Sequence, residues 1–264
     1  MKKYLFAITI FMICISMTTA LSISAAEDTP HSWYCVRNKE HKQPRIDPAM
    51  QFIEQYHAYY VDRRHGDDAR EKVVYLTFDA GYENGNVAKI LDVLREESVS
   101  GAFFVLGHLI SSQPELIQRM QKEGHIVANH TYHHKDMTTL DQFEQFEEEL
   151  NSLNERYYAL TGSHMANYYR PPEGKFDERS LSYAQRMGYQ TIFWSLAYAD
   201  WDNANQPSEE AAMNKLRTYM HNGAIILLHP TSETNAKILG PLIRELKASG
   251  YRFGTLDELT REAP

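Results

Sequence analysis

Two histidines of this chain are spaced so that they could bind one metal ion. His130 and His134 lie four residues apart in the run His-Thr-Tyr-His-His. If the backbone turns helically there, both imidazoles project on one side and could share a divalent ion. The alternative is a surface cluster, because 12 histidines are scattered along the chain. The pair is the sharpest local indication of metal-dependent chemistry.

An aspartate and an arginine each follow a short apolar stretch. Asp79 comes directly after Leu-Thr-Phe, and a carboxylate at the end of a buried strand is held in place rather than freely solvated. Arg170 precedes two prolines, which stiffen the backbone of the loop that it begins. Asp79 could instead form a turn beside Gly81, and Arg170 could be a structural arginine.

A histidine and a carboxylate in the C-terminal part of the chain could also act together. His229 ends the apolar run Ala224–Leu228. Asp200 could orient His229 and tune its pKa, as carboxylates do for catalytic histidines. The alternative for His229 is a capped core histidine. Trp201 follows Asp200 and could stack on a sugar face, whereas we assign Trp194 to packing.

The elements between these residues predict how they come together. From residue 72 onward, β-rich and helical stretches alternate, which favours a parallel sheet. Strands are predicted at 73–78, 102–106, 126–128, 166–169, 189–194, 224–228 and 251–254. Helices are predicted at 86–97, 114–123, 140–160, 178–187, 209–221 and 236–249.

The candidate residues follow different strands, which separates a barrel from an open sheet. In a barrel the carboxyl ends of the strands converge on one face, whereas an open sheet spreads them across its width. No glycine-rich phosphate loop follows the first strand, which disfavours a dinucleotide-binding fold. We therefore expect an α/β fold: a distorted, incomplete (β/α) barrel of about seven parallel strands.

The N-terminus predicts export. Two lysines precede an apolar run that ends at Ile15, and Ser24-Ala25-Ala26 offers the small residues of a cleavage site. We expect residues 1–26 to be a signal peptide that directs the protein to the cell envelope or the medium. An uncleaved anchor is the alternative, although serines and threonines dilute the run. The mature chain would keep one cysteine, Cys35, and no internal disulfide.

Composition bounds the remaining chain. Its 264 residues carry 27 Lys and Arg against 35 Asp and Glu, a net charge of −8, which makes nucleic acid an unfavourable partner. No stable membrane span is expected after signal cleavage. Residues 27–70 form a polar lead-in segment with one helix predicted over 48–60, and residues 71–264 form the main domain.

The candidate residues together resemble the motifs of the polysaccharide deacetylase family. The members of this family are family 4 carbohydrate esterases that share a NodB homology domain. The resemblance covers roughly residues 73–259, and its five motifs occur in the family's order. These motifs are Thr77-Phe78-Asp79-Ala80-Gly81, His130-Thr131-Tyr132-His133-His134, Arg170-Pro171-Pro172-Glu173-Gly174, Asp200-Trp201 and Leu228-His229. The resemblance implies a NodB-like barrel for residues 71–264.

The resemblance also implies a metal and a base. His130 and His134 would hold a divalent metal, expected to be zinc, which polarises the acetamide carbonyl and activates a water. Asp79 would accept the proton of that water, and Arg170 would pair with Asp79 to keep it ionised.

The remaining motifs imply an acid and an oxyanion site. His229, oriented by Asp200, would protonate the leaving amine. The oxyanion would rest on the metal and on a backbone N–H near Glu173. The implied enzyme is a hydrolase of carbon–nitrogen bonds other than peptide bonds.

One residue departs from the family pattern. Ala80 stands where the family has a second aspartate, a metal ligand. Alanine cannot ligate, so two histidines and waters would hold the metal weakly. The subgroup that deacetylates muramic acid on the way to muramic δ-lactam in the spore cortex also lacks this aspartate. The segments at 81–85, 193–197 and 235–236 resemble that subgroup.

The implied substrate is therefore a peptidoglycan glycan strand whose muramic acid has lost its peptide. Arg170 or Lys175 could bind the free lactyl carboxylate of that sugar. One alternative is the same chemistry on N-acetylglucosamine, in peptidoglycan or chitin-like oligomers. Another is a glycan-binding protein without turnover, which the intact acid-base set disfavours.

Overall fold

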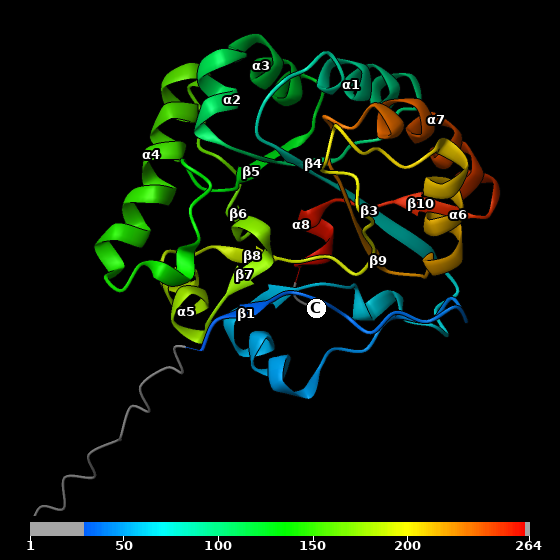
Figure 1. Ribbon diagram of the computed structural model, residues 1–264, viewed down its shortest axis with the longest axis horizontal. Helices are drawn as coiled ribbons and strands as arrows, with labels where there is room; N and C mark the ends of the chain where they lie inside the picture. The colour runs from blue at the N-terminus through cyan, green and yellow to red at the C-terminus, as the bar shows by residue number, and fades with distance from the viewer. Residues whose placement is uncertain (1–28, 262–264) are drawn as a thin grey trace, which may run out of the picture.

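A curled sheet of eight parallel strands positions the predicted site residues (Figure 1). The computed structural model describes residues 29–261, so the predicted signal peptide lies outside the described residues. The strands are β2 (Ala58–Tyr59), β3 (Lys72–Ala80), β4 (Ala102–Val105), β5 (Ile126–Asn129), β6 (Tyr168–Tyr169), β8 (Gln190–Ile192), β9 (Ala224–Leu228) and β10 (Tyr251–Phe253). Their order is β10-β3-β4-β5-β6-β8-β2, and β9 pairs with β3. The seven predicted strands are confirmed, and β2 is additional.

Helices surround the sheet (Figure 1). They are α1 (Val87–Glu96), α2 (Gly107–Ser112), α3 (Pro114–Lys122), α4 (Phe143–Thr161), α5 (Glu178–Arg186), α6 (Glu209–Tyr219), α7 (Glu233–Ala248) and α8 (Leu256–Leu259). Short 3-10 helices are η1 (Pro48–Tyr56), η2 (Arg63–His65), η3 (Met137–Thr139) and η4 (Pro172–Gly174). The six predicted helices of the main domain are present, whereas α2 and α8 were not predicted. Within residues 29–261, none of the helices has the length and apolar character that a bilayer crossing requires.

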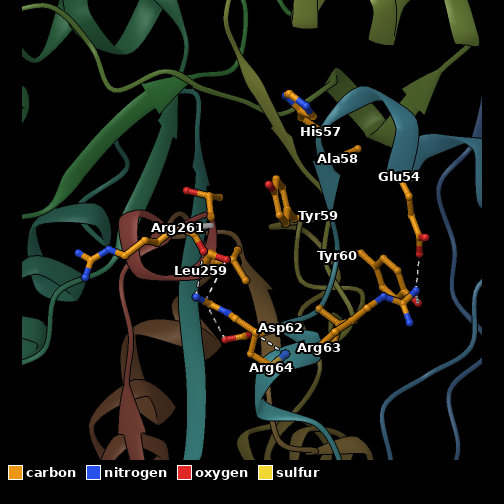
Figure 2. Close-up of a pocket in the computed structure, with 12 residues that line it drawn as sticks. Glu54, His57, Ala58, Tyr59, Tyr60, Asp62, Arg63, Arg64, Leu259 and Arg261 are labelled. Atoms are coloured by element: carbon orange, nitrogen blue, oxygen red, sulfur yellow. Dashed lines mark hydrogen bonds and ion pairs between the residues drawn. The ribbon is translucent and has the colours of Figure 1, made fainter. Parts of the chain in front are cut away.

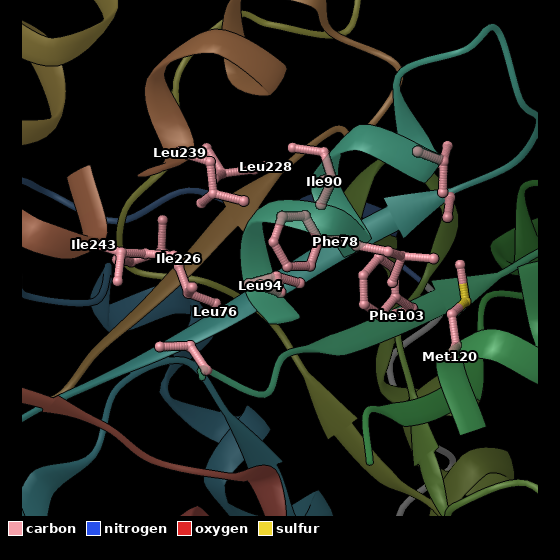
Figure 3. Packing of buried hydrophobic residues seen from close by; sticks show 14 of the residues in the cluster. Leu76, Phe78, Ile90, Leu94, Phe103, Met120, Ile226, Leu228, Leu239 and Ile243 are labelled. Atoms are coloured by element: carbon pink, nitrogen blue, oxygen red, sulfur yellow. The ribbon is translucent and has the colours of Figure 1, made fainter. Parts of the chain in front are cut away.

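Alternate residues of the central strands face two different hydrophobic clusters, as the period of a strand requires. The outer cluster joins Leu76 and Phe78 of β3 to the surrounding helices, and Phe78 stacks on Phe103 with ring centroids 4.7 Å apart (Figure 3). The inner cluster joins Val73 and Tyr75 of β3 to the other strands and to α8. Apolar side chains therefore fill the space inside the curled sheet. Polar residues lie at the carboxyl ends of the strands.

The barrel is incomplete, as predicted. Beyond β8, Leu196 makes an isolated parallel bridge to Ile226 of β9, and Val61 after β2 makes an isolated antiparallel bridge to Ala224, so among the described residues the two edges of the sheet are joined only by isolated bridges. The curled shape brings the carboxyl ends of the strands toward a common centre. This is the face on which a barrel builds its active site.

The lead-in segment differs from its prediction. A single helix was expected over 48–60, but η1 ends at Tyr56 and His57 adopts a left-handed conformation with φ of 49°. The chain then turns into β2, which pairs with β8 of the main sheet. The described part of the segment is thus built into the same sheet as the main domain.

A pocket of about 300 Å³ lies between the lead-in segment and the end of the chain (Figure 2). Tyr59 and Arg63 line it from one side, and Leu259 and Arg261 line it from the other. Arg63 pairs with Glu54 at its rim. None of the predicted site residues lines this pocket, so it is separate from the candidate active site.

Candidate active site

The predicted site residues lie where strands end. Asp79 is in β3, His130 and His134 follow β5, Arg170 follows β6, Asp200 follows β8, and His229 follows β9. Parallel strands place these carboxyl ends on one face of the barrel. The alternation of apolar strands with polar loop residues was therefore a sound guide to position.

Arg170 is buried completely and is bound on every side. Its Nη1 lies 2.8 Å from Oδ1 of Asp79, and its Nη2 donates to the hydroxyl of Thr77 at 2.9 Å. Its Nε donates to the carbonyl of Ile192 at 2.8 Å. The guanidinium also lies over the ring of Phe104, 4.1 Å from the centroid. These contacts give Arg170 and Asp79 one fixed arrangement.

The charge of Arg170 decides the state of Asp79. Burial raises the pKa of Asp79, but opposing causes, chiefly the charge of Arg170, which also donates a hydrogen bond to the carboxylate, lower it by more, so the net pKa lies below the ordinary value. The carboxyl group is therefore ionised at neutral pH. Its second oxygen, Oδ2, faces His130 at 3.6 Å from Nε2.

His130 has the tautomer of a metal ligand. Its Nδ1 lies 2.8 Å from the carbonyl oxygen of Arg170, to which it donates its proton. Burial lowers the pKa of His130 to about 4, so the ring is neutral and Nε2 keeps a free lone pair. The ring of His134 lies beside it, with centroids 5.0 Å apart and an interplanar angle of 73°.

The two rings meet without a helical turn. Thr131 and His134 have φ of 71° and 59°, so the backbone passes twice through the left-handed region. The hydroxyl of Thr131 accepts the backbone N–H of His134 at 2.9 Å and stabilises this turn. The predicted pairing of the imidazoles holds, but the helical geometry from which it was argued is absent.

A divalent metal fits these residues only in part. The free Nε2 of His130 beside His134 is suited to an ion, yet no group of three His, Cys, Asp or Glu in residues 29–261 could hold one. Ala80 is buried in the outer hydrophobic cluster. Glu83 accepts the backbone N–H of Val87 at 2.9 Å and caps α1. The protein therefore offers two imidazoles, and water or substrate must complete the coordination.

Asp200 holds His229 through two contacts. Its Oδ1 lies 2.7 Å from Nδ1 of His229, and its Oδ2 accepts the backbone N–H of the same residue at 2.8 Å. Burial lowers the pKa of His229, but the hydrogen bond and charge of Asp200 raise it by more, so the net pKa lies above the ordinary value. The imidazole is thus adapted to hold and release a proton.

Two supporting residues were not predicted from the sequence. Asn235 in α7 donates to Oδ2 of Asp200 at 2.6 Å and to the carbonyl of His229 at 3.0 Å. Glu149 in α4 is buried and accepts Nδ1 of His133 at 2.8 Å and Nζ of Lys135 at 2.7 Å. Asn235 lies 35 positions from Asp200 and Glu149 lies 16 positions from His133, in each case on a different element, and no local pattern marks such contacts.

The site therefore combines an ionised carboxylate with an imidazole whose pKa is raised. A pair of titratable groups whose environments separate their pKa values is the arrangement of a general base and a general acid. The two imidazoles of His130 and His134 stand beside the base. This constellation is suited to the hydrolysis of an amide, which needs both a proton acceptor and a proton donor.

Known proteins share this fold and sequence. A family model described as polysaccharide deacetylase matches residues 66–192. The chain is 43% identical to the peptidoglycan-N-acetylmuramic acid deacetylase PdaA of Bacillus subtilis over 244 residues, which are 92% of this chain and 90% of that protein. The structure of PdaA, described as a family 4 carbohydrate esterase, matches with a TM-score of 0.82 over 88% of this chain and 97% of that one.

Two further relatives agree. The structure of a family 4 carbohydrate esterase from Bacillus anthracis matches with a TM-score of 0.72 at 38% identity, over 89% of this chain and 98% of that one. A peptidoglycan-N-acetylglucosamine deacetylase from Bacillus cereus is 31% identical over 194 residues, which are 72% of this chain and 89% of that protein. By fold, sequence and the geometry of its site, the chain belongs to the polysaccharide deacetylase family.

Proposed function

We propose that this hydrolase removes the acetyl group from N-acetylmuramic acid in peptidoglycan. The observation that carries the proposal is the Asp79–Arg170 and His229–Asp200 pairing, in a chain 43% identical to a protein of that name. We further propose that residues 1–26 direct export, and that the product leads to muramic δ-lactam in the spore cortex. N-terminal sequencing of protein from the medium and the envelope tests the export step.

The base side begins the reaction. Asp79 accepts a proton from the attacking water, and it can do so because Arg170 keeps it ionised at neutral pH. Thr77 and the carbonyl of Ile192 hold the guanidinium in place, so the carboxylate cannot swing away from the reacting centre. Positioning of this kind reduces the entropy lost in reaching the transition state.

The acid side completes the reaction. His229 donates its proton to the nitrogen of the leaving amine, because an amine anion is too basic to leave unprotonated. Asp200 fixes the imidazole through Nδ1, which leaves Nε2 to face the substrate. Asn235 holds the carboxylate of Asp200 in turn.

Metal dependence is a property of the family, and the identity of the ion is part of the proposal. His130 and His134 would hold the ion, which we expect to be weakly bound zinc. When bound, it supplies positive charge that polarises the acetamide carbonyl and makes a water more acidic. The carbonyl of Arg170 orients His130 for this role.

Exposed aromatic rings beside the site support a glycan substrate. Trp201 follows Asp200 and is 63% exposed, and Tyr82 follows the loop of Asp79 and is 44% exposed. The side chain of Asn203 bonds to the hydroxyl of Tyr82 and links the two loops. Flat exposed rings on both loops suit the apolar faces of sugar residues.

The lactyl carboxylate finds no spare cation where one was expected. Arg170 is buried against Asp79, and Nζ of Lys175 lies 2.8 Å from Glu173 and 3.3 Å from Asp136. Both cations are already paired within the protein. The preference for peptide-free muramic acid therefore rests on the resemblance to the δ-lactam subgroup and not on a free positive group.

The test is mass spectrometry of defined glycan strands treated with the purified protein. We expect loss of acetyl groups from muramic acid in peptide-free strands, and suppression by a chelator. Equal or faster release from N-acetylglucosamine or chitin oligomers would instead establish the alternative substrate. The Asp79→Asn variant is the control, and no release by the wild-type protein with added metal would refute the proposal.

A further inference from the structure

An extended segment near the start of the described chain lies against two catalytic loops: the loop that starts at Arg170 and the segment that leads from β8 to Asp200. Residues 31–37, which we call the N-terminal strap, begin with β1 (His31–Ser32), which pairs antiparallel with β7 (Lys175–Phe176). The next backbone N–H, that of Trp33, donates to the carbonyl of Gly174 at 2.8 Å. The strap thereby closes the loop that starts at Arg170.

Alternate side chains of the strap contact a second loop. Nε1 of Trp33 donates to the carbonyl of Trp194 at 2.8 Å, and Nη1 of Arg37 donates to the carbonyl of Ala197 at 2.6 Å. Between them, the thiol of Cys35 lies 3.4 Å from the carbonyl of Ser195. These donors share one face of the extended strap, because strand side chains alternate. The contacted carbonyls belong to the segment that leads from β8 to Asp200.

The opposite face of the strap makes none of these contacts to the catalytic loops. Tyr34 and Val36 are 50% and 56% exposed, and the hydroxyl of Tyr34 donates to Asp47 within the lead-in segment. The strap therefore contains residues that contact the catalytic loops, such as Trp33 and Arg37, and a neighbour, Tyr34, whose side chain does not. This alternation provides internal controls for the role of the buried face.

Trp33 connects the two loops most directly. Its ring stacks on Phe193 with centroids 4.4 Å apart and an interplanar angle of 19°. Arg170 donates to the carbonyl of the same phenylalanine at 3.3 Å. A Cβ on Gly174 would lie 3.0 Å from Cβ of Trp33 and 2.8 Å from the ring of Trp194, so the packing admits only glycine there. One buried side chain thus borders the base-side loop and the acid-side segment at once.

We infer that Trp33 is a positioning residue for the catalytic site, and that the N-terminal strap sets the relative placement of the Arg170 loop and the Asp200 segment. The backbone N–H of Trp33 holds the carbonyl of Gly174 at the end of the Arg170 loop. The indole N–H of Trp33 holds the carbonyl of Trp194 at the beginning of the Asp200 segment. Without the indole donor, the carbonyl of Trp194 loses its tie, and the segment that carries Asp200 gains freedom. The expected consequence is a poorer alignment of Asp200 with His229.

The experiment compares Trp33→Phe and Arg37→Met with the control Tyr34→Phe. Trp33→Phe keeps an aromatic ring and the backbone N–H but removes the indole donor, and Arg37→Met removes an exposed donor to Ala197. Only the kcat readout rests on the proposed deacetylation, so the turnover of the wild-type protein is measured first. We expect kcat to fall about tenfold in Trp33→Phe and severalfold in Arg37→Met, with KM nearly unchanged.

A second readout does not need substrate. His229 faces Asp200, Asp79 and Arg170, and NMR titration of its imidazole reports how well Asp200 is aligned. We expect the pKa of His229 to fall in Trp33→Phe and to stay at the wild-type value in Tyr34→Phe. A folded Trp33→Phe protein with unchanged kcat and unchanged His229 titration would overturn the inference. An inactive wild-type protein with a shifted titration in Trp33→Phe would refute only the proposed function.

Discussion

The base side and the acid side of this site are held by different kinds of structure. Asp79 and Thr77 belong to β3, and Arg170 is anchored by carbonyls at the end of β8, so the base side is part of the sheet. His229 and Asp200 instead depend on a loop and on Asn235 at the start of α7. The sheet supplies a buried charge pair, whereas loop and helix residues hold the proton donor. Substitutions on the two sides should therefore fail in different ways.

The largest effect is expected from Asp79→Asn. Loss of the proton acceptor should lower kcat by about 10²–10⁴ on every acetylated substrate, because each needs an activated water. Amide hydrolysis on glycan strands and ester hydrolysis on an aryl acetate measure this with the same protein. A circular dichroism spectrum controls for folding, and near-normal turnover of either substrate would remove Asp79 from the mechanism.

His229→Ala should separate the acid side from the base side. On the amide substrate we expect a loss of about 10²–10⁴, because the leaving amine must be protonated. On an aryl acetate the leaving phenolate needs no proton, so most of the activity should remain. Equal losses on both substrates would mean that His229 positions water or substrate rather than acting as an acid.

The two histidines beside the base offer a smaller and more local comparison. His134→Ala should weaken metal binding by about tenfold or more, equivalent to about 1.4 kcal/mol, because it removes one of two imidazole ligands. His133→Ala is the matched control, since His133 is bonded to Glu149 and not to the pair. Calorimetric titration with zinc compares the variants, and equal affinities would exclude His134 as a ligand.

Asp200→Asn should lower kcat and should also change the pH profile. Asp200 holds the pKa of His229 above its ordinary value, and the acid must be protonated to act. Activity is therefore present below that pKa and is lost as the pH rises through it. Removing the carboxylate lowers the pKa, so the alkaline limb of kcat should move to lower pH. An unmoved limb would show that a group other than His229 controls it.

Sequence reasoning located the strand-borne residues better than the contacts between loops. Apolar runs ending at Asp79 and His229 predicted strands, and parallel strand ends converge for a general geometric reason. The turn between His130 and His134 could not be predicted, because it depends on a left-handed Thr131. The predicted partner of Asp200, His229, lies beside it, but the contact with Asn235 could not be predicted, since Asn235 lies 35 positions away on another element.

The lead-in segment shows the same limit on a larger scale. Its apolar periodicity over 48–60 predicted one helix, but the left-handed His57 ends the helical turns and allows β2 to join the sheet. Pairing with β8 is a long-range interaction that the local pattern does not encode. The sequence therefore predicted only a polar lead-in segment, whereas in the structure this segment supplies the edge strand β2 and the N-terminal strap.

The strap also has a consequence for the order in which the molecule assembles. The hydrogen bond from Trp33 to Trp194 joins residues that are 161 positions apart, whereas the strand pairs β3–β4, β4–β5 and β6–β8 join segments that are close in the sequence. Long loops close more slowly than short ones, so contacts between successive strands should form first during folding. The catalytic loops would then be locked late, together with the long-range strand pairs β3–β9 and β3–β10. On unfolding, this long-range closure should open first, and competence for catalysis should be lost before the hydrophobic clusters separate.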